Sequence, residues 1–385
     1  MRRALSTEFG PFDGRVWLNC AHQGPLPRAA QLAALEAIDL KRTPSRLSDR
    51  LFSEVPERLR NALGRLVGAD PAEIALTNST SYGFNLLAQG LPWRAGDEIL
   101  CVDGDFPATI VPWRPLERDG VRIRLVSAPG ARLTAERLAE ELSPDTRAVV
   151  VSWVFSFFGH AIDLETIGRV CRERDVYLFV NGSQGVGARE LDVASLPIDA
   201  LSSCGFKWLC GPYATGFVWL SPRILGELDY PNPHWLRLQM AAADVGADLA
   251  RRLDYALVEE TAASAYDVFC AANFLNFMTW TAAVEHLLDV GVPAIAEHDQ
   301  VLVDHCIESL PPPFTIESPT ETPERSTLVL FSHADADRNP ALAGELAAAG
   351  VDLALRDGKL RISPHLYNST ADIDIAVDAL ARAAR

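Results

Sequence analysis

An alternation of short apolar segments and amphipathic segments between residues 73 and 220 constrains the fold of this chain more than any other feature. The short segments are typical of buried strands, and the segments between them carry apolar residues at helical spacing. Strands separated by helices form mostly parallel sheets that are covered on both faces, so the sequence predicts an α/β domain. Strands are predicted at 73–77, 97–102, 121–126, 147–154, 176–180, 200–203 and 216–220, and helices at 79–91, 134–142 and 164–174.

The regions on either side of this alternation predict more helices and a second, smaller domain. Residues 27–68 have apolar positions at helical spacing. After about residue 250 the regular alternation of strand and helix patterns gives way to a long apolar helix pattern and then to a weaker mixture of strands and helices. We expect a large domain over residues 16–250 and a small domain over residues 1–15 and 251–385. The later region predicts helices at 269–290, 339–349 and 370–384 and strands at 326–331 and 360–362.

The charge and the apolar content of the chain disfavour several classes of partner. The net charge of −16 repels the phosphate backbone of nucleic acids and anionic membrane surfaces. No apolar run approaches the roughly 20 residues that a bilayer span needs, and the first residues do not resemble a signal peptide. Seven cysteines occur without a CxxC pair, so we expect no metal site. A cytoplasmic enzyme is the expectation.

The chain has only three lysines, and one of them is in a setting that suits covalent chemistry. Lys41 is in a polar helix end and Lys359 is in a turn, so we expect solvated amines at both positions. Lys207 follows a predicted strand and stands between aromatic residues and glycines. Burial lowers the pKa of an amine, and a neutral amine can form an imine. The residues alone leave open a buried lysine that is paired with a carboxylate.

Two polar segments are predicted at strand ends, where ligands of such sheets bind. Residues 77–85 open a predicted helix, and N–H groups and hydroxyls at a helix N-terminus suit a phosphate, although they also suit an ordinary helix cap. Asn181 ends another predicted strand and is followed by a glycine-rich turn that carries Gln184. We expect the side chain of Asn181 to point into the ligand crevice.

Five separated segments resemble the class V aminotransferase family of fold-type I enzymes, which use pyridoxal 5′-phosphate (PLP). The family includes cysteine desulfurases, kynureninases and isopenicillin N epimerase-like proteins. The resemblance implies a fold-type I PLP-dependent transferase, with a mostly parallel mixed sheet covered by helices in the large domain and a smaller C-terminal α+β domain. It also implies a homodimer. The five segments are 16–27, 77–85, 106–113, 179–217 and 360–368.

The resemblance also implies a role in cofactor binding for particular residues. Lys207 is expected to form the Schiff base with PLP and to shuttle the proton. Thr80 and Ser81 are expected to bind the phosphate through backbone N–H groups and hydroxyls. Phe106 is expected to stack on the pyridine ring, and Gln184 to bond to its 3-oxygen. In the substrate-binding part of the site, Arg361 and His22 are expected, with the planar guanidinium of Arg361 holding an α-carboxylate.

Several positions depart from the pattern of the family. Asn181 stands where relatives have an aspartate that keeps the pyridine nitrogen protonated, so we expect a weaker electron sink. Cys204 stands where many relatives have a phosphate-binding serine. Phe158 and the pair Cys270-Ala271 also replace polar residues that contact the cofactor in relatives. The absence of a cysteine from residues 351–359 disfavours a cysteine desulfurase.

These features predict a PLP-dependent enzyme that acts on the α-amino group of an amino-acid-like substrate. An epimerase-like or lyase-like outcome, by carbon–sulfur cleavage or decarboxylation, suits the altered electron sink better than ordinary transamination does. Specialised metabolism is the expected setting. Two alternatives stay open: an ordinary aminotransferase, and a chain that keeps the fold but has lost PLP catalysis and serves as a binding protein or a cofactor-independent catalyst.

Overall fold

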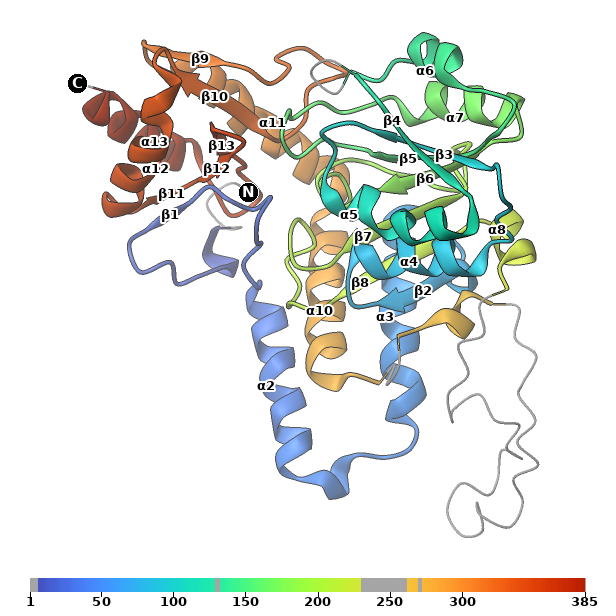
Figure 1. Ribbon diagram of the computed structural model, residues 1–385. Helices are drawn as coiled ribbons and strands as arrows, with labels where there is room; N and C mark the ends of the chain where they lie inside the picture. Colours follow the sequence, from blue (N-terminus) through green and yellow to red (C-terminus); the bar gives the residue numbers. More distant parts are fainter. Residues whose placement is uncertain (1–5, 129–131, 230–261, 269–271, 385) are drawn as a thin grey trace.

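A sheet of seven strands lies at the centre of the computed structural model, which describes residues 6–128, 132–229, 262–268 and 272–384 (Figure 1). The strand order is β2-β8-β7-β6-β5-β3-β4. The pairs from β7 to β4 are parallel, and β8 is antiparallel to both of its neighbours, so the predicted mixed sheet is confirmed. The strands are β2 (Ile74–Thr77), β3 (Glu98–Val102), β4 (Arg122–Val126), β5 (Thr146–Ser152), β6 (Tyr177–Asn181), β7 (Ala200–Cys204) and β8 (Gly216–Leu220).

Helices cover both faces of this sheet because its strands are apolar on both sides. Along β5, Val149 and Val151 pack into one apolar cluster, and Ala148 and Val150 pack into another on the opposite face. The first cluster includes residues of α3 (Leu51–Val67), α6 (Ala135–Glu141), α7 (Leu164–Glu173) and α10 (Phe274–Val290). The second includes residues of α4 (Thr80–Gly90), η4 (Val111–Asp119) and α8 (Pro222–Glu227), with α5 (Pro107–Ile110) beside it.

The C-terminal elements form a separate α+β unit with its own apolar cluster, drawn in orange and red in Figure 1. Its four-stranded sheet has the order β12-β13-β10-β9 and is antiparallel throughout. The strands are β9 (Phe314–Ile316), β10 (Val329–His333), β12 (Ala354–Arg356) and β13 (Lys359–Ile362), and the helices are α11 (Val292–Ser309), α12 (Asn339–Ala348) and α13 (Thr370–Ala383). The helix α11 is absent from the sequence prediction.

The N-terminal segment joins the two units. The strand β1 (Val16–Trp17) pairs in parallel with β11 (Val351–Asp352), and Val16 and Leu18 pack into the C-terminal cluster. The helix α2 (Arg28–Arg42) then packs against α10 of the large unit. The expected boundary at residue 250 lies outside the described residues, and the proposed division of the chain into two domains stays a prediction. Short 3-10 helices are η1 (Ser6–Glu8), η2 (Pro44–Arg46), η3 (Pro71–Glu73), η7 (Ala263–Tyr266) and η8 (Ala336–Arg338).

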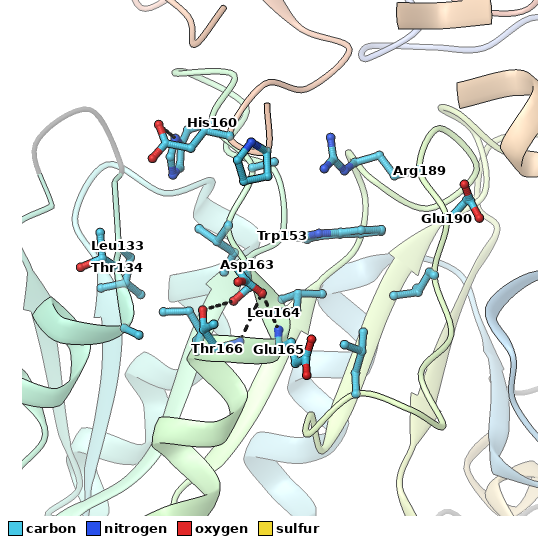
Figure 2. A pocket seen from close by; sticks show the side chains of 18 of the residues that line it. Leu133, Thr134, Trp153, His160, Asp163, Leu164, Glu165, Thr166, Arg189 and Glu190 are labelled. Carbon is cyan, nitrogen blue, oxygen red and sulfur yellow. Dashed lines mark hydrogen bonds and ion pairs between the residues drawn. The ribbon is translucent and has the colours of Figure 1, made fainter. Parts of the chain in front are cut away.

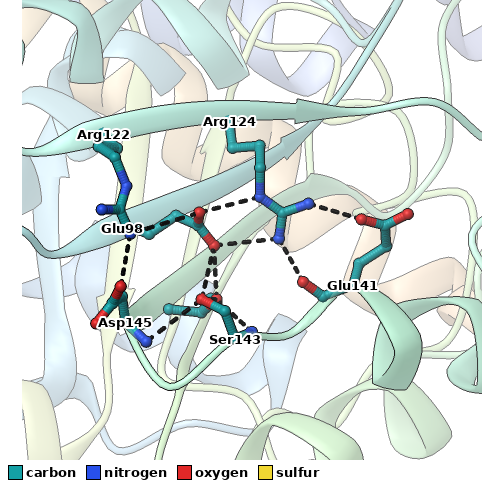
Figure 3. A network of polar contacts seen from close by, with 7 residues as sticks. Glu98, Arg122, Arg124, Glu141, Ser143 and Asp145 are labelled. Atoms are coloured by element: carbon teal, nitrogen blue, oxygen red, sulfur yellow. Dashed lines mark hydrogen bonds and ion pairs between the residues drawn. The ribbon is translucent and has the colours of Figure 1, made fainter.

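The two edges of the large sheet have different chemistry. At the amino ends of β3, β4 and β5, Glu98 accepts hydrogen bonds from Arg124 and Thr146 and forms a polar network (Figure 3). The carboxyl ends of β5, β6 and β7 instead carry Ser152, Asn181 and Cys204. Such an edge is where ligands of open parallel sheets bind, so this end of the sheet positions the candidate site. No helix of the described residues is long and apolar enough to cross a membrane.

Candidate active site

A cavity of about 300 Å³ lies at this carboxyl edge and collects most of the residues that the sequence singled out. Its walls come from the N-terminus of α4, the turn after β6, the loop after β7 and the C-terminal strands β12 and β13. The structure therefore brings together segments that are far apart in the sequence. Of the predicted site residues, those that line the cavity are His22, Thr80, Ser81, Phe106, Gln184, Cys204, Lys207 and Arg361.

The helix α4 begins at this cavity, as the serine- and threonine-rich segment predicts. The hydroxyl of Ser79 caps the helix by accepting a hydrogen bond from the N–H of Tyr82 at 3.3 Å. Thr80 and Ser81 are the first two residues of the helix and both line the cavity. The hydroxyl of Thr80 lies 2.6 Å from that of Ser183. Free N–H groups and hydroxyls at a helix N-terminus form a suitable cradle for a phosphate group.

Lys207 reaches the cavity from the loop after β7. Lys207 makes no ion pair with any described residue. The alternative of a buried lysine that is paired with a carboxylate therefore has no support among these residues. Burial and the positive charges of Arg361 and Arg356 lower the pKa of its amine. The Nζ atom lies 5.4 Å from the centre of the Phe106 ring. A partly buried amine with a lowered pKa is suited to nucleophilic attack on an aldehyde.

The loop that carries Lys207 is held by the N-terminal segment. The N–H of Gly24 donates to the carbonyl of Phe206 at 2.9 Å. A Cβ atom at Gly24 would lie 2.1 Å from the carbonyl oxygen of Lys207, so only glycine fits there. The same carbonyl accepts a hydrogen bond from the N–H of Cys210 at 2.9 Å. These contacts fix the backbone from which the lysine side chain extends.

Aromatic side chains supply the apolar part of the cavity. Phe106 stacks on Phe157, with ring centres 6.1 Å apart and an interplanar angle of 27°. Phe206 stacks on Tyr213 with a centre distance of 4.5 Å. Phe157 lines the cavity where the resemblance pointed to Phe158, whose ring instead lies 5.0 Å from the Nζ atom of Lys359.

Gln184 faces the cavity but its hydrogen bonds are already used. Its Nε2 donates to the carbonyl of Ala21 at 3.1 Å and to the hydroxyl of Ser156 at 3.2 Å, and its Oε1 accepts from Trp208 Nε1 at 2.8 Å. A bond from Gln184 to a cofactor oxygen would replace the one to Ser156, whose hydroxyl also lines the cavity. The role expected for Gln184 stays a prediction.

Asn181 is the predicted residue that does not line the cavity. It is buried at the end of β6, where its Nδ2 donates to the hydroxyl of Thr109 at 2.9 Å. Its Oδ1 accepts from the N–H of Ser183 at 3.1 Å, and Ser183 does line the cavity. The amide is therefore one residue behind the surface that a ligand would touch, and its contact with a pyridine nitrogen stays a prediction.

Arg361 is almost fully buried and points into the cavity from β13. Its Nη1 donates to the carbonyl of Ser156 at 3.1 Å, and its Nε has no hydrogen-bond partner among the described residues. Burial, together with the charge of Arg356, lowers the pKa of Arg361 to about 9. Burial also lowers the pKa of His22, as do Arg356, Arg361 and Lys207. A buried guanidinium without a carboxylate is well suited to bind an anionic group of a ligand.

The cavity includes residues that the sequence did not single out. Ser183 and Ser156 could have been found because both stand next to residues of recognised segments. Arg356 gave no signal, because a basic residue before Asp-Gly is typical of a solvated turn. The pair Cys270-Ala271 lies outside the described residues. The additional cavity residues include Ser79, Ser156, Phe157, Ser183, Tyr213 and Arg356.

The charge of the walls distinguishes this cavity from a larger one nearby. The larger cavity, of about 630 Å³, is lined by carboxylates, among them Asp163 and Glu190, beside the Trp153 ring (Figure 2). It contains none of the predicted site residues. The smaller cavity has no aspartate or glutamate among the described residues that line it. Anionic ligands therefore suit the smaller cavity, although the chain as a whole is acidic.

The residues of the smaller cavity fit PLP. An amine suited to imine formation, a helix N-terminus with hydroxyls and an aromatic ring all face the same space. Arg361 lines the same cavity and pairs with no carboxylate of the described residues, so its guanidinium suits the carboxylate of a substrate. Cys204 lines the wall next to Lys207 and offers a weaker hydrogen-bonding group than a serine would.

Comparisons with solved structures show the same fold. The cystine C–S lyase C-DES, in complex with its reaction product cysteine persulfide, superimposes with a TM-score of 0.84 at 23% identity, covering 96% of this chain and 97% of that one. The cysteine desulfurase CsdA of Escherichia coli gives a TM-score of 0.82 at 21% identity, covering 100% and 98%. The predicted fold-type I architecture is confirmed.

Comparisons of sequence show the family. The chain is 32% identical over 231 residues to the isopenicillin N epimerase of Streptomyces clavuligerus, and 28% identical over 219 residues to a probable cysteine desulfurase of Methanothermobacter thermautotrophicus. These matches cover 57% and 56% of this chain, and only 57% and 55% of the two relatives. The family described as Aminotransferase class-V matches residues 40–375. The chain therefore belongs to the class-V aminotransferases, and it is an enzyme of this PLP-dependent family.

Proposed function

We propose that this enzyme acts on the α-amino group of an amino-acid-like substrate, with an epimerase-like or lyase-like outcome in specialised metabolism. One observation carries the proposal: the amine of Lys207 and the guanidinium of Arg361 line the same cavity, and no described residue of the cavity walls offers a carboxylate to either of them. An α-amino acid carries an amine next to a carboxylate. The carboxylate can pair with Arg361, and the amine then lies near Lys207, where a cofactor bound to that lysine would be.

PLP, when bound, withdraws electrons from the α-carbon of an amino acid that is joined to it. The protein residues supply the binding and the proton transfer. Arg361 holds the carboxylate in a pair that burial strengthens, and so orients the bonds of the α-carbon. Lys207 would hold the cofactor through its amine, and as a free neutral amine it could accept a proton, which the resulting ammonium could then deliver.

The roles of the other predicted site residues are proposed from their positions in or next to the cavity. Thr80 and Ser81 bind the phosphate at the N-terminus of α4, and Phe106 covers the pyridine ring. Gln184 contacts the 3-oxygen, Cys204 takes the position of a phosphate ligand, and His22 contacts the substrate. Asn181 is proposed to face the pyridine nitrogen, which would leave that nitrogen without a negatively charged partner. This supports an outcome other than ordinary transamination. A homodimer and a cytoplasmic location stay predictions.

The attachment of PLP to Lys207 is tested on purified protein. Added PLP is expected to give a visible absorbance band that borohydride bleaches, and mass spectrometry of the reduced protein is expected to find the pyridoxyl group on the peptide that contains Lys207. Lys207→Ala is expected to lose both signals. Lys41→Ala, which removes an exposed amine on α2, is the matched control and should keep them.

Failure of PLP to attach to the wild-type protein would overturn the proposal and favour the alternative in which the fold is kept and PLP catalysis is lost. The reaction type is tested separately by incubation with amino acids in deuterated water. Exchange of the α-hydrogen without loss of the amino group supports an epimerase-like reaction, and release of a side-chain fragment or of carbon dioxide supports a lyase. Stoichiometric conversion of the substrate to its keto acid would instead show an ordinary aminotransferase.

A further inference from the structure

The cavity contains a second guanidinium, that of Arg356, for which the proposed reaction gives no use. Arg356 ends β12, and its Nη1 donates to the carbonyl of its neighbour Leu355 at 2.8 Å. No carboxylate of the described residues pairs with it within 4.0 Å, in contrast to Lys359, whose Nζ lies 3.4 Å from Glu317 Oε2. Arg356 thus adds a positive charge to the cavity without an acidic partner.

A tight hairpin fixes the position of Arg356 relative to Arg361. Strands β12 and β13 are antiparallel, with Arg356 opposite Lys359 and Ala354 opposite Arg361. The turn between them is Asp357-Gly358, and both residues have positive φ angles, 48° and 74°, as a two-residue hairpin of the primed type requires. The register of the two strands is therefore defined by the turn itself.

This register places both arginines on one face of the hairpin. Opposite residues of an antiparallel pair share a face, and so do residues two apart on one strand, so Arg356 and Arg361 are diagonal neighbours. Diagonal neighbours are about 7–8 Å apart, and their Cβ atoms are somewhat closer. Two guanidinium groups at this spacing can each bind a different carboxylate of one small molecule.

The cavity carries more positive charge than a single α-carboxylate compensates. The charge of Arg356 contributes to the lowered pKa values of Arg361, Lys207 and His22, so these groups act on one another. One α-carboxylate compensates only one of the two guanidinium groups. The phosphate cradle at the start of α4 is built from N–H groups and hydroxyls and does not include Arg356.

Resting on the proposed function, we propose that the substrate carries a second acidic group in its side chain and that Arg356 binds it. Arg361 holds the α-carboxylate, and Arg356, at the tip of the same hairpin, holds the distal carboxylate. The substrate class is therefore the acidic amino acids and their longer homologues. Arg356 is a specificity-determining residue, because its pair with the substrate distinguishes acidic side chains from neutral ones of equal shape.

The test uses pairs of amino acids that differ in charge but hardly in size. The PLP-loaded protein is titrated with L-glutamate and L-glutamine, L-aspartate and L-asparagine, the other common amino acids, and L-2-aminoadipate. Binding is measured by calorimetry and by the change in the cofactor absorbance, without reliance on turnover. We expect the acid of at least one pair to bind about tenfold or more tightly than its amide.

Arg356→Gln is expected to abolish this difference, and the variant should still attach PLP to Lys207. Lys359→Gln is the matched control, since it removes a basic side chain from the same face of the same hairpin but outside the cavity, and should keep the preference. Thermal unfolding of both variants shows whether the hairpin is intact.

The outcomes separate this inference from the proposed function. Amides that bind as well as their acids, or an acid preference that survives in Arg356→Gln, would overturn the role of Arg356 and leave the proposed function standing. A loss of PLP affinity in Arg356→Gln, with amino acid selectivity unchanged, would assign Arg356 to the cofactor and overturn the inference. A protein that loads PLP on Lys207 but binds no amino acid of the panel would contradict both.

Discussion

The Nδ1 atom of His365 lies 2.8 Å from Oδ2 of Asp299, and neither side chain is accessible to solvent. The other ring nitrogen, Nε2, lies 3.1 Å from the carbonyl oxygen of Trp208, which follows Lys207 in the chain. Both nitrogens face acceptors, so the ring is an imidazolium. Burial acts to lower the pKa of His365, but the charge of Asp299 and its hydrogen bond raise it to about 10. This buried ion pair supports the loop of Lys207 from behind.

Asp299→Asn is expected to destabilise the protein by about 3–5 kcal/mol, because it leaves a buried cation without its partner. The folded pKa of His365 is above its ordinary value of 6.5, so the pair contributes its full stability below pH 6.5 and loses it as the pH rises toward 10. The difference between wild type and variant in urea unfolding should therefore shrink over that range.

The control for this prediction is Asp374→Asn, which removes the carboxylate from another aspartate–histidine pair. His305 Nε2 lies 2.7 Å from Asp374 Oδ1, but both side chains are partly exposed. An exposed pair contributes about 0–1 kcal/mol, so little change is expected. Equal losses in the two variants would contradict the importance of burial for the His365 pair.

Gly24→Ala is expected to displace the loop that carries Lys207, because its Cβ would lie 2.1 Å from the carbonyl oxygen of that residue. Overpacking of this kind costs about 1–3 kcal/mol. Calorimetric unfolding should show the loss, and PLP should attach more slowly. Gly344→Ala in α12 meets no atom within 4 Å and should be neutral or stabilising. An unchanged rate of attachment in Gly24→Ala would contradict the predicted displacement.

Glu98→Gln is expected to weaken the network at the amino ends of the strands (Figure 3). Burial acts to raise the pKa of Glu98, but the hydrogen bonds from Arg124 and Thr146 lower it below its ordinary value of 4.5. The stabilisation is therefore present above pH 4.5 and is lost as the pH falls through the folded pKa. Acid unfolding followed by circular dichroism should show the two proteins converging at low pH.

Glu140→Gln serves as the comparison for the network, since Glu140 makes a 3.6 Å pair with Arg137 at the surface. A change of less than about 0.5 kcal/mol is expected. A gap between wild type and Glu98→Gln that widens on acidification would mean that the pKa of Glu98 is raised, contrary to the network described here.

Asn181→Asp is expected to change the absorbance of the bound cofactor and the distribution of products. An aspartate would supply the negative charge that keeps the pyridine nitrogen protonated, which an amide cannot do. Thr109, which now accepts a hydrogen bond from Asn181 Nδ2, can rotate its hydroxyl to donate to the new carboxylate. Unchanged spectrum, rate and products in a folded variant would refute the proposed role of Asn181.

The strands and helices that position the site could be predicted because a short stretch of sequence marks where each of them begins or ends. The strand that ends at Asn181 and the helix that begins after Ser79 are both marked by an apolar run next to polar or glycine residues. In contrast, α11 was missed, since its buried Asp299 interrupts the apolar pattern. The burial of Asp299 depends on a partner 66 residues away, which no local pattern reports.

The prediction of the site had the same limit. Lys207 and Arg361 could be found because each stands in a recognisable segment. Arg356 reaches the cavity only because the hairpin folds it next to Arg361, and this requires the strand register. Lys359 was expected to be a solvated lysine, but its amine pairs with Glu317 and lies over the Phe158 ring.

The N-terminal segment connects the two sides of the candidate active site through backbone hydrogen bonds. Leu18 and Cys20 exchange backbone hydrogen bonds with Ser363, two residues after Arg361, and Gly24 bonds to the loop of Lys207 a few residues later. A single short stretch of backbone is thus hydrogen-bonded to the residues after β13, the strand of Arg361, at one end and to the loop of Lys207 at the other. The spacing between the guanidinium of Arg361 and the amine of Lys207 therefore depends on this one backbone segment, and a change in the segment would alter the distance between the two groups.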